Sequence, residues 1–271
     1  MLTVAILLFN FGILAVVVAS SFSNTGFVVF PPHGFTIHWY SLAISSYHDS
    51  FLLSLRVALT AGLGATLVGT GAAMAFVRGR ARHRVAWSYF LTLPIVVPTT
   101  LYAFALLAAI ARVGWTPNFY LLVLAFIIVG TPFSVRIVAG ALEGVDWSLE
   151  VAARTLGAGP VRAWTRVVLP VIWPSVASGF VFGFLVAFDD SVLSVFLARP
   201  GFQTFSAQVL SDIEQALTPQ VAAACSLVIG VTLVGAIGLL LLYRLAQARR
   251  KSFSTGAAGA SAATTLEGVR P

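Results

Sequence analysis

Charged side chains are scarce in this chain. Only 9% of its 271 residues are Asp, Glu, Lys or Arg, whereas a typical soluble domain has roughly a quarter. Apolar residues make up 59%, and the mean hydropathy is +0.96. This composition predicts an integral membrane protein. The net charge of +7 comes from arginines in short clusters between apolar runs, which is typical of orientation signals and argues against a nucleic acid partner.

Lysine and cysteine are almost absent, with one residue of each. A phosphate-binding loop of the form G-x-x-x-x-G-K-[ST] needs a lysine that follows a glycine. The only lysine is Lys251, and Arg250 precedes it. This chain therefore has no Walker A motif, and a separate subunit would have to bind any ATP. The single cysteine, Cys225, lies in an apolar run, so neither a disulfide framework nor a cysteine metal site is expected.

Sequence motifs of common hydrolases are missing too. The chain contains no Gly-x-Ser-x-Gly, no His-Glu-x-x-His and no Gly-x-Gly-Asp, which argues against a hydrolytic enzyme. His33, His38 and His48 have neither a cysteine nor a carboxylate cluster beside them. We therefore expect no metal site among them.

Six apolar runs approach the length of about 20 residues that a membrane-spanning helix needs. The first lacks a basic segment before it, so we interpret it as a membrane helix and not as a signal peptide. Pro94 and Pro98 interrupt the third, which predicts a kinked helix. Residues 1–251 are expected to form the membrane domain, and 252–271 a disordered tail. The runs are 2–19, 51–77, 87–110, 119–138, 174–197 and 220–243.

Small residues recur at every fourth position in two of these runs. That spacing places them on one face of a helix, where they allow another helix to approach closely. The chain between the first two runs, from Phe22 to Asp49, is polar and aromatic and is expected to be an external loop. The two stripes are Ala61, Ala65, Gly69 and Ala73 in the second run, and Ser175, Gly179, Gly183, Ala187 and Ser191 in the fifth.

The arginines also predict the orientation in the membrane. When loops are assigned alternately to the two sides, twelve basic residues fall on one side and three on the other. Because basic loops stay in the cytoplasm, both termini are expected there. The three are Arg56, Arg112 and Arg199; the twelve are Arg78, Arg80, Arg82, Arg84, Arg136, Arg154, Arg162, Arg166, Arg244, Arg249, Arg250 and Lys251.

One polar stretch on the basic side, residues 146–170, predicts two short helices with a break between them. Asp146 is a good N-cap, and Glu150 and Arg154 stand at i, i+4. Gly157 and Gly159 end the first helix, and Pro160 suits the start of the second. We expect Leu169–Pro170 to end the second helix. From spacing alone, an amphipathic loop on the membrane surface is an equally good interpretation.

The sequence from Glu150 to Ala158, with the later Val-Leu-Pro at 168–170, resembles the EAA loop of the permease subunits of binding-protein-dependent ABC importers. In that family the loop forms a coupling helix that docks on a separate ATPase subunit. One departure is that the family glutamate corresponds to Val151. The coupling residues that the resemblance implies are Leu149, Glu150, Val151, Ala152, Ala153, Arg154, Leu156, Gly157 and Ala158.

Two further stretches resemble the spermidine/putrescine type of this family, in particular its second permease subunit. They are Phe-Pro-Pro-His-Gly-Phe at 30–35, with Trp39 and Tyr40, and the segment Phe188-Asp189-Asp190. Carboxylates within an apolar run are functional candidates, and with aromatic faces beside them they suit an ammonium ligand. One aspartate would face the substrate path while the other caps or pairs. Alternatively, the pair holds subunits or a gate together.

The resemblance implies an all-α integral membrane protein with about six membrane helices, the MetI-like fold and a cytoplasmic coupling helix. It also implies a place in the bacterial inner membrane and four kinds of neighbour: a second permease, two ATPase subunits, an external solute-binding protein and lipid. This chain would bind no cofactor, and ATP with magnesium would belong to the ATPase. Two alternatives remain: a secondary transporter that uses Asp189 or Asp190 as its ion site, although we find no internal repeats, and a membrane anchor without a path.

Overall fold

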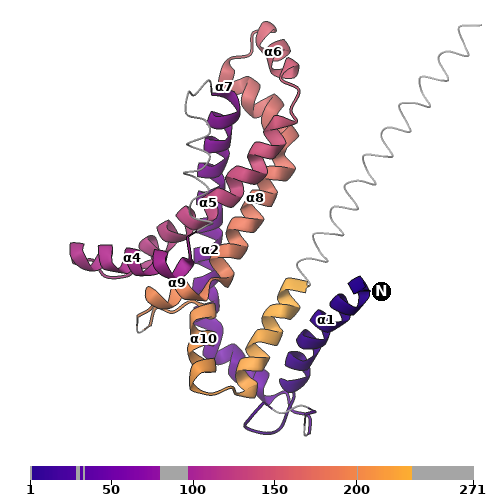
Figure 1. Cartoon of the computed structure of the whole chain (residues 1–271), viewed down its shortest axis with the longest axis vertical. Helices are drawn as coiled ribbons and strands as arrows, with labels where there is room; N and C mark the ends of the chain where they lie inside the picture. Colours follow the sequence, from indigo (N-terminus) through magenta and orange to yellow (C-terminus); the bar gives the residue numbers. More distant parts are fainter. Residues whose placement is uncertain (1, 29–30, 33, 80–96, 200, 234–271) are drawn as a thin grey trace, which may run out of the picture. The chain divides into compact units, whose positions relative to one another are not determined.

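Helices make up all the regular secondary structure that is described in this computed structural model (Figure 1). It describes residues 2–28, 31–32, 34–79, 97–199 and 201–233. The described residues form two compact units, 2–44 with 217–233 and 45–216. Each unit is described by itself.

The first unit contains α1 (Leu2–Ser20), the start of α2 (His38–Arg78) and a helix over Pro219–Leu233. The hydroxyl of Tyr40 connects all three segments. It is hydrogen-bonded to Ser21 Oγ at 2.7 Å and to Ser226 Oγ at 3.0 Å. In addition, Trp39 Nε1 donates to the carbonyl oxygen of Ser23 at 2.8 Å. The aromatic residues after the first helix thus hold this unit together.

The second predicted run is confirmed as a helix, but α2 is longer, with 41 residues. Our expectation of a loop up to Asp49 is wrong from His38 onward. No glycine or proline stands between Gly34 and Gly62 to stop the helix. The polar side chains of this segment also find partners: Ser50 Oγ, for example, donates to the carbonyl oxygen of Tyr47 at 3.0 Å.

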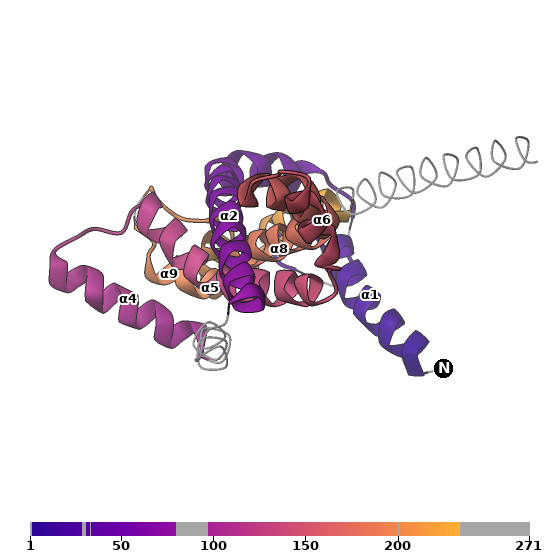
Figure 2. The same ribbon diagram turned by 90° about the horizontal axis from the view of Figure 1, so that it is seen from above.

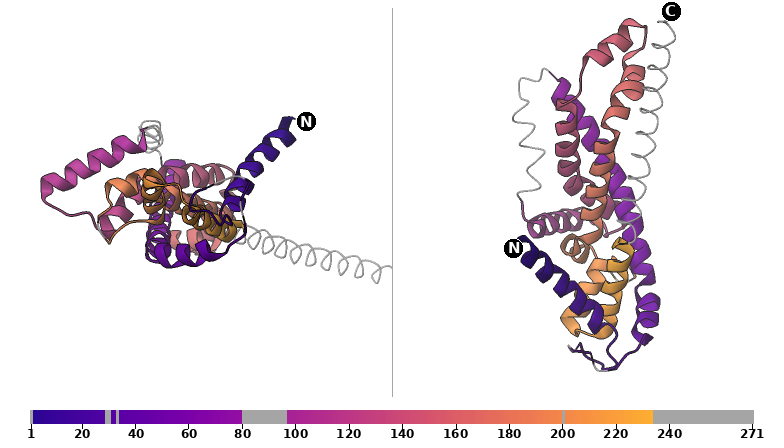
Figure 3. Two further views of the ribbon diagram at one scale, coloured as in Figure 1. Left: turned by 90° about the horizontal axis from the view of Figure 1, so that it is seen from below. Right: turned by 90° about the vertical axis from the view of Figure 1, so that its right-hand side faces the viewer.

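Close contacts among α2, α5 (Phe119–Glu143) and α8 (Leu169–Asp189) organise the second unit. Figures 1 and 3 show α5 and α8 side by side, and Figure 2 shows α2 beside them. A Cβ added to Gly183 would lie 3.3 Å from Gly62 Cα, and one added to Gly130 would lie 3.2 Å from Ala65 Cβ. Ser134 Oγ donates to the carbonyl oxygen of Gly179 at 3.1 Å. The predicted stripes of small residues are therefore confirmed as packing faces. Their buried members are Ala61, Ala65, Gly69, Ala73, Gly179, Gly183 and Ala187.

The prolines act differently from our expectation. Pro98 occupies the N-cap of α4 (Thr99–Val113), so it starts a helix there and does not kink one. Pro94 lies outside the described residues. Helix α5 extends beyond residue 138, with Pro132 inside it and Arg136 in its interior, so Arg136 does not mark its end.

The short helix α7 (Pro160–Ala163) continues through a π-helical turn, Trp164–Val168, directly into α8. The predicted stop at Leu169–Pro170 is therefore wrong. Proline has no N–H to donate, and the π-helical turn changes the hydrogen-bond ladder just before Pro170. The result is one apolar helix over Pro160–Asp189, with 30 residues.

The fifth run is not a single helix. Helix α8 ends at Asp189, Asp190 has an extended backbone, and the short α9 (Ser191–Phe196) follows. The loop expected after residue 199 contains another helix, α10 (Phe205–Gln215), whose N-terminus is capped by Thr204. The fifth run is therefore less regular than the sequence predicted, and the loop after it is more structured.

Three of the described helices are long and apolar enough to cross a membrane: His38–Arg78, Phe119–Glu143 and Pro160–Asp189. Three shorter apolar helices accompany them, over Leu8–Ser20, Thr99–Val113 and Pro219–Leu233. These segments confirm the predicted all-α membrane fold. Residues 252–271 lie outside the described residues, so the tail stays a prediction.

Gly69→Ala should destabilise the second unit by about 1–3 kcal/mol, the usual cost of overpacking. The new Cβ would lie 2.6 Å from Ser134 Cβ and 3.1 Å from the backbone nitrogen of Val135. Gly71→Ala on the same helix is the control, because a Cβ there meets nothing within 4 Å. Thermal unfolding of the detergent-solubilised protein measures both variants. Equal midpoints for the two would contradict the packing argument.

Candidate functional site: the loop between α5 and α8 and a cavity beside α10

The loop between α5 and α8 begins with a capped helix, α6 (Ser148–Thr155). Asp146 Oδ1 accepts a hydrogen bond from the backbone N–H of Ser148 at 2.9 Å, which is the predicted capping interaction, although Trp147 occupies the N-cap position. The Ser148 hydroxyl and backbone N–H hold the pKa of Asp146 below its ordinary value. After α6, Gly157 has φ +89°, a left-handed conformation that strains any other residue. The predicted break between two short helices is therefore present.

The inner side of α6 carries an ion pair with the end of α2. Glu150 is 3% exposed, and its Oε1 accepts from a guanidinium nitrogen of Arg78. The Arg78 guanidinium also lies over the ring of Trp147, 5.3 Å from its centroid. Glu150 Oε2 has no hydrogen-bond partner among the described residues. Because a lone buried carboxylate is costly, Arg78 stabilises the position of α6 against α2.

The outer side of the same helix is open. Leu156 is 88% exposed, an unusual position for a leucine outside the lipid-facing helices. Of the residues predicted to couple to an ATPase, Glu150 alone is buried, so its carboxylate contacts this chain and not the surface. Ala153 and Ala158 are half-buried. The exposed predicted residues are Leu149, Val151, Ala152, Arg154, Leu156 and Gly157.

A hollow of about 330 Å³ opens between the end of α6 and the α7 segment. Its apolar lining includes Leu156 and Val167, and Arg162 and Arg166 add positive charge. These two arginines were not among the residues predicted to couple to an ATPase, although they belong to the same loop. Figure 1 shows α6 and α7 at one end of the second unit, beyond the ends of α5 and α8.

At the other end of α8, the two aspartates have different environments. Asp190 Oδ1 accepts from the backbone N–H of Leu193 at 2.7 Å and so caps α9. The carbonyl oxygen of Asp190 accepts from Ser206 Oγ at 3.2 Å. Asp189 is exposed. Half-buried Phe188 packs against two aromatic rings, with centroid distances of 5.9 Å to Phe51 and 5.8 Å to Phe184.

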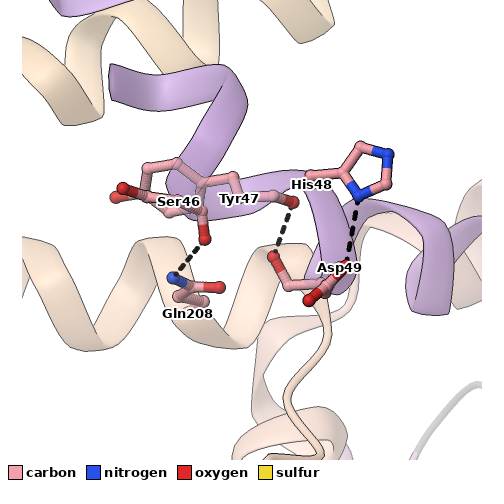
Figure 4. Close-up of polar contacts among 6 residues, drawn as sticks. Ser46, Tyr47, His48, Asp49 and Gln208 are labelled. Carbon is pink, nitrogen blue, oxygen red and sulfur yellow. Dashed lines mark hydrogen bonds and ion pairs between the residues drawn. The ribbon is translucent and has the colours of Figure 1, made fainter. Parts of the chain in front are cut away.

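A cavity of about 520 Å³ lies beside α10. It was missed in the sequence analysis, although Arg56, a charged residue inside an apolar run, was a usable signal. Hydrogen bonds connect its two walls, as Figure 4 shows in part: Gln208 Nε2 donates to the carbonyl oxygen of Ser46 at 3.3 Å. The lining residues are Ser46, Asp49, Ser50, Leu52, Leu53, Arg56, Gly201, Phe202, Gln203 and Gln208.

Residues 65–251 match the family model described as "Binding-protein-dependent transport system inner membrane component". The chain belongs to this family. It is 30% identical to the putrescine transport system permease protein PotI of Escherichia coli strain K12 over 80% of each protein. It is also 30% identical to the spermidine/putrescine permease protein PotC of that strain, over 84% of this chain and 87% of PotC.

Solved structures show the same fold. A bacterial ABC transporter involved in the import of alginate contains a chain that superposes with a TM-score of 0.63 and 14% identity, covering 91% of this permease and 94% of that chain. Together, the family match and the relatives confirm the predicted importer permease of the inner membrane. They also confirm the resemblance to the polyamine type at the level of sequence.

Arg78→Gln should destabilise the permease by about 2 kcal/mol. Breaking a fully buried pair costs roughly 3–5 kcal/mol, but Arg78 is partly exposed and its contribution is screened. The double variant Arg78→Gln/Glu150→Gln should be more stable than Arg78→Gln, because it leaves no unpaired buried carboxylate. Thermal unfolding and protease sensitivity of residues 146–159 are the measurements.

Arg154→Gln is the matched control for this pair, since Arg154 is exposed on α6. It should leave both readouts unchanged. If the double variant were no more stable than Arg78→Gln, the buried ion pair would not be what positions α6.

Proposed function

We propose that this permease forms, with a second permease subunit, the translocation path of an ATP-driven importer for a small organic amine of the polyamine type. The importer contains two ATPase subunits, one of which docks on the 146–170 loop of this chain, and an external solute-binding protein delivers the solute. ATP and magnesium belong to the ATPases, and this chain catalyses no reaction itself. The observation that carries the proposal is α6, exposed on its outer side and held to α2 by the Glu150–Arg78 pair on its inner side.

The helix over Pro160–Asp189 gives the loop a mechanical connection to the other end of the unit. It runs without interruption from the segment after α6 to Asp190, where the helix ends. The Glu150–Arg78 pair ties the same loop to α2. Movement of the loop by closing ATPases would therefore move α2 and α8 together, and the path would open to the outside by rigid-body motion.

The charge distribution supports a cytoplasmic loop. Within the described residues, the loop end of the second unit carries Arg78, Arg154, Arg162 and Arg166. Basic residues stay on the cytoplasmic side. We infer that α6 faces the cytoplasm, where an ATPase can reach it, and that α10 lies toward the outside. Both termini are then cytoplasmic.

The relatives and the chemistry of Asp189 support an amine as the solute. PotI and PotC are described as permeases for putrescine and for spermidine with putrescine. Asp189 is exposed and directly follows Phe188 in the sequence. A carboxylate next to an aromatic face attracts an ammonium group by charge and by the cation–π interaction. Because Asp190 caps α9, we assign the role of facing the path to Asp189.

Leu156→Asp should abolish co-purification of the ATPase and reduce ATP-driven uptake to background. It places a carboxylate on the apolar docking face without changing the backbone of Gly157, whose φ of +89° would add strain to any substitution there. Leu217→Asp is the control: Leu217 is also exposed, lies outside this loop, and its variant should retain the ATPase. An ATPase that co-purifies equally with both variants would contradict docking at α6. Uptake that follows an ion gradient and not ATP would indicate a secondary transporter.

Asp189→Asn should lower putrescine uptake about tenfold or more, because it removes a charge-assisted contact with the ammonium group. Asp190→Asn should have a smaller effect, since asparagine also caps helix N-termini well. Proteoliposomes with the complete transporter and radiolabelled putrescine provide the measurement. Wild-type uptake by the Asp189→Asn variant would remove this residue from the path.

A further inference from the structure

The cavity beside α10 is lined by two residues of opposite charge, Asp49 and Arg56. They do not form an ion pair with each other. Asp49 and Arg56 are seven residues apart on α2, which places them on one helix face with a rise of about 10.5 Å between them. Asp49 Oδ1 lies 3.1 Å from His48 Nδ1 (Figure 4), and the side chain of Asp49 is fully exposed. Within the described residues, no ion pair is found for Arg56.

Arg56 is the more informative of the two. It lies within the apolar, membrane-crossing helix His38–Arg78. Its side chain is exposed, and it stands 22 residues before Arg78, about 33 Å along the helix and so near one end of a membrane-spanning length. Its guanidinium presents donors in a planar fork that matches the two oxygens of a carboxylate. The residue therefore fits an anionic group that enters the cavity.

Hydrogen bonds between α2 and α10 fix the shape of the cavity walls. Tyr47 Oη donates to Asp212 Oδ2 at 2.5 Å, and the backbone N–H of Phe205 donates to Ser54 Oγ at 2.7 Å. The first bond joins α2 to the body of α10, and the second joins α2 to the first residue of α10. On the loop side, the Arg199 guanidinium packs over the ring of Phe202, 5.5 Å from its centroid. A cavity fixed at several points is preformed for a ligand.

We propose that this cavity binds a small zwitterion, with its carboxylate on Arg56 and its ammonium group on Asp49. The apolar side chains of Leu53 and Phe202 contact the short carbon chain between them, and Gln203 and Gln208 add polar contacts. The volume of about 520 Å³ is within the range of small-molecule sites. This inference rests on the proposed function and extends its solute class from polyamines to small amines that also carry a carboxylate.

A doubly charged polyamine fits this site less well. One of its ammonium groups can meet Asp49, but the other would approach Arg56, and like charges at short range repel. A dicarboxylate has the reverse problem at Asp49. Only a solute with one charge of each sign satisfies both residues, which gives the cavity selectivity by repulsion as well as by attraction.

The test is equilibrium binding to the purified permease–ATPase assembly without its solute-binding protein, whose own affinity would otherwise dominate. The probes are radiolabelled putrescine, 4-aminobutanoate and succinate, three four-carbon solutes that differ only in their end groups. The variants are Arg56→Gln, which removes the cation, and Arg56→Lys, which keeps it. Arg112→Gln, an exposed arginine on α4 outside the cavity, is the control.

We expect 4-aminobutanoate to bind the wild type at least about tenfold more tightly than putrescine or succinate, as one charge-assisted contact suggests. Arg56→Gln should abolish this preference over putrescine, Arg56→Lys should keep most of it, and Arg112→Gln all of it. Tighter binding of putrescine than of 4-aminobutanoate, no binding of 4-aminobutanoate, or unchanged binding in Arg56→Gln would each overturn the inference. ATP-driven putrescine uptake alongside any of these results would leave the proposed function intact.

Discussion

Contact between glycine-bearing helix faces is the constraint on which the rest of this permease depends. Helices gain little from the hydrophobic effect inside a bilayer, because lipid tails are as apolar as leucine. Close approach of backbones must supply the attraction instead, and the missing Cβ atoms of Gly62, Gly130 and Gly183 allow it among α2, α5 and α8. The loop at one end of this frame and the cavity at the other both use α2 as a wall. Their positions therefore depend on the same contact.

In the proposed mechanism the frame would transmit movement of the loop, because helices connect the two without a linker. Helix α8 continues through the π-helical turn into α7 with no flexible linker. The Glu150–Arg78 pair adds a second attachment, from α6 to α2. At the opposite end, the helix is interrupted at Asp190. The carbonyl oxygen of Asp190 accepts a hydrogen bond from Ser206 Oγ, just inside α10. A displacement of the loop would thus reach the segment beside the cavity through two neighbouring helices.

The sequence predicted those features that depend on local spacing. The stripes of small residues, the cap at Asp146 and the turn at Gly157 each follow from residues a few positions apart. The errors have partners far along the chain. Helix α10 and the early start of α2 are stabilised together by the bond from Tyr47 to Asp212, 165 residues away. The inward position of Glu150 depends on Arg78, 72 residues away. Neither pairing leaves a periodic signal in the sequence.

The two ends of the second unit use charge in opposite ways. At the loop end, Glu150 is buried, and its pairing with Arg78 stabilises one arrangement of α6. At the other end, Asp49 and Arg56 line an open cavity and are held apart on one helix. Two charges that form an ion pair with each other fix the position of the helices that carry them. Two charges that are kept apart can each bind a ligand group. Arg56 is exposed, and no ion pair is found for it among the described residues, so its guanidinium can bind a ligand carboxylate. The same reasoning makes Asp189, which is exposed and does not have the capping role of Asp190, suited to a cation. A solute that carries both charges could therefore meet matching groups at successive points along one path.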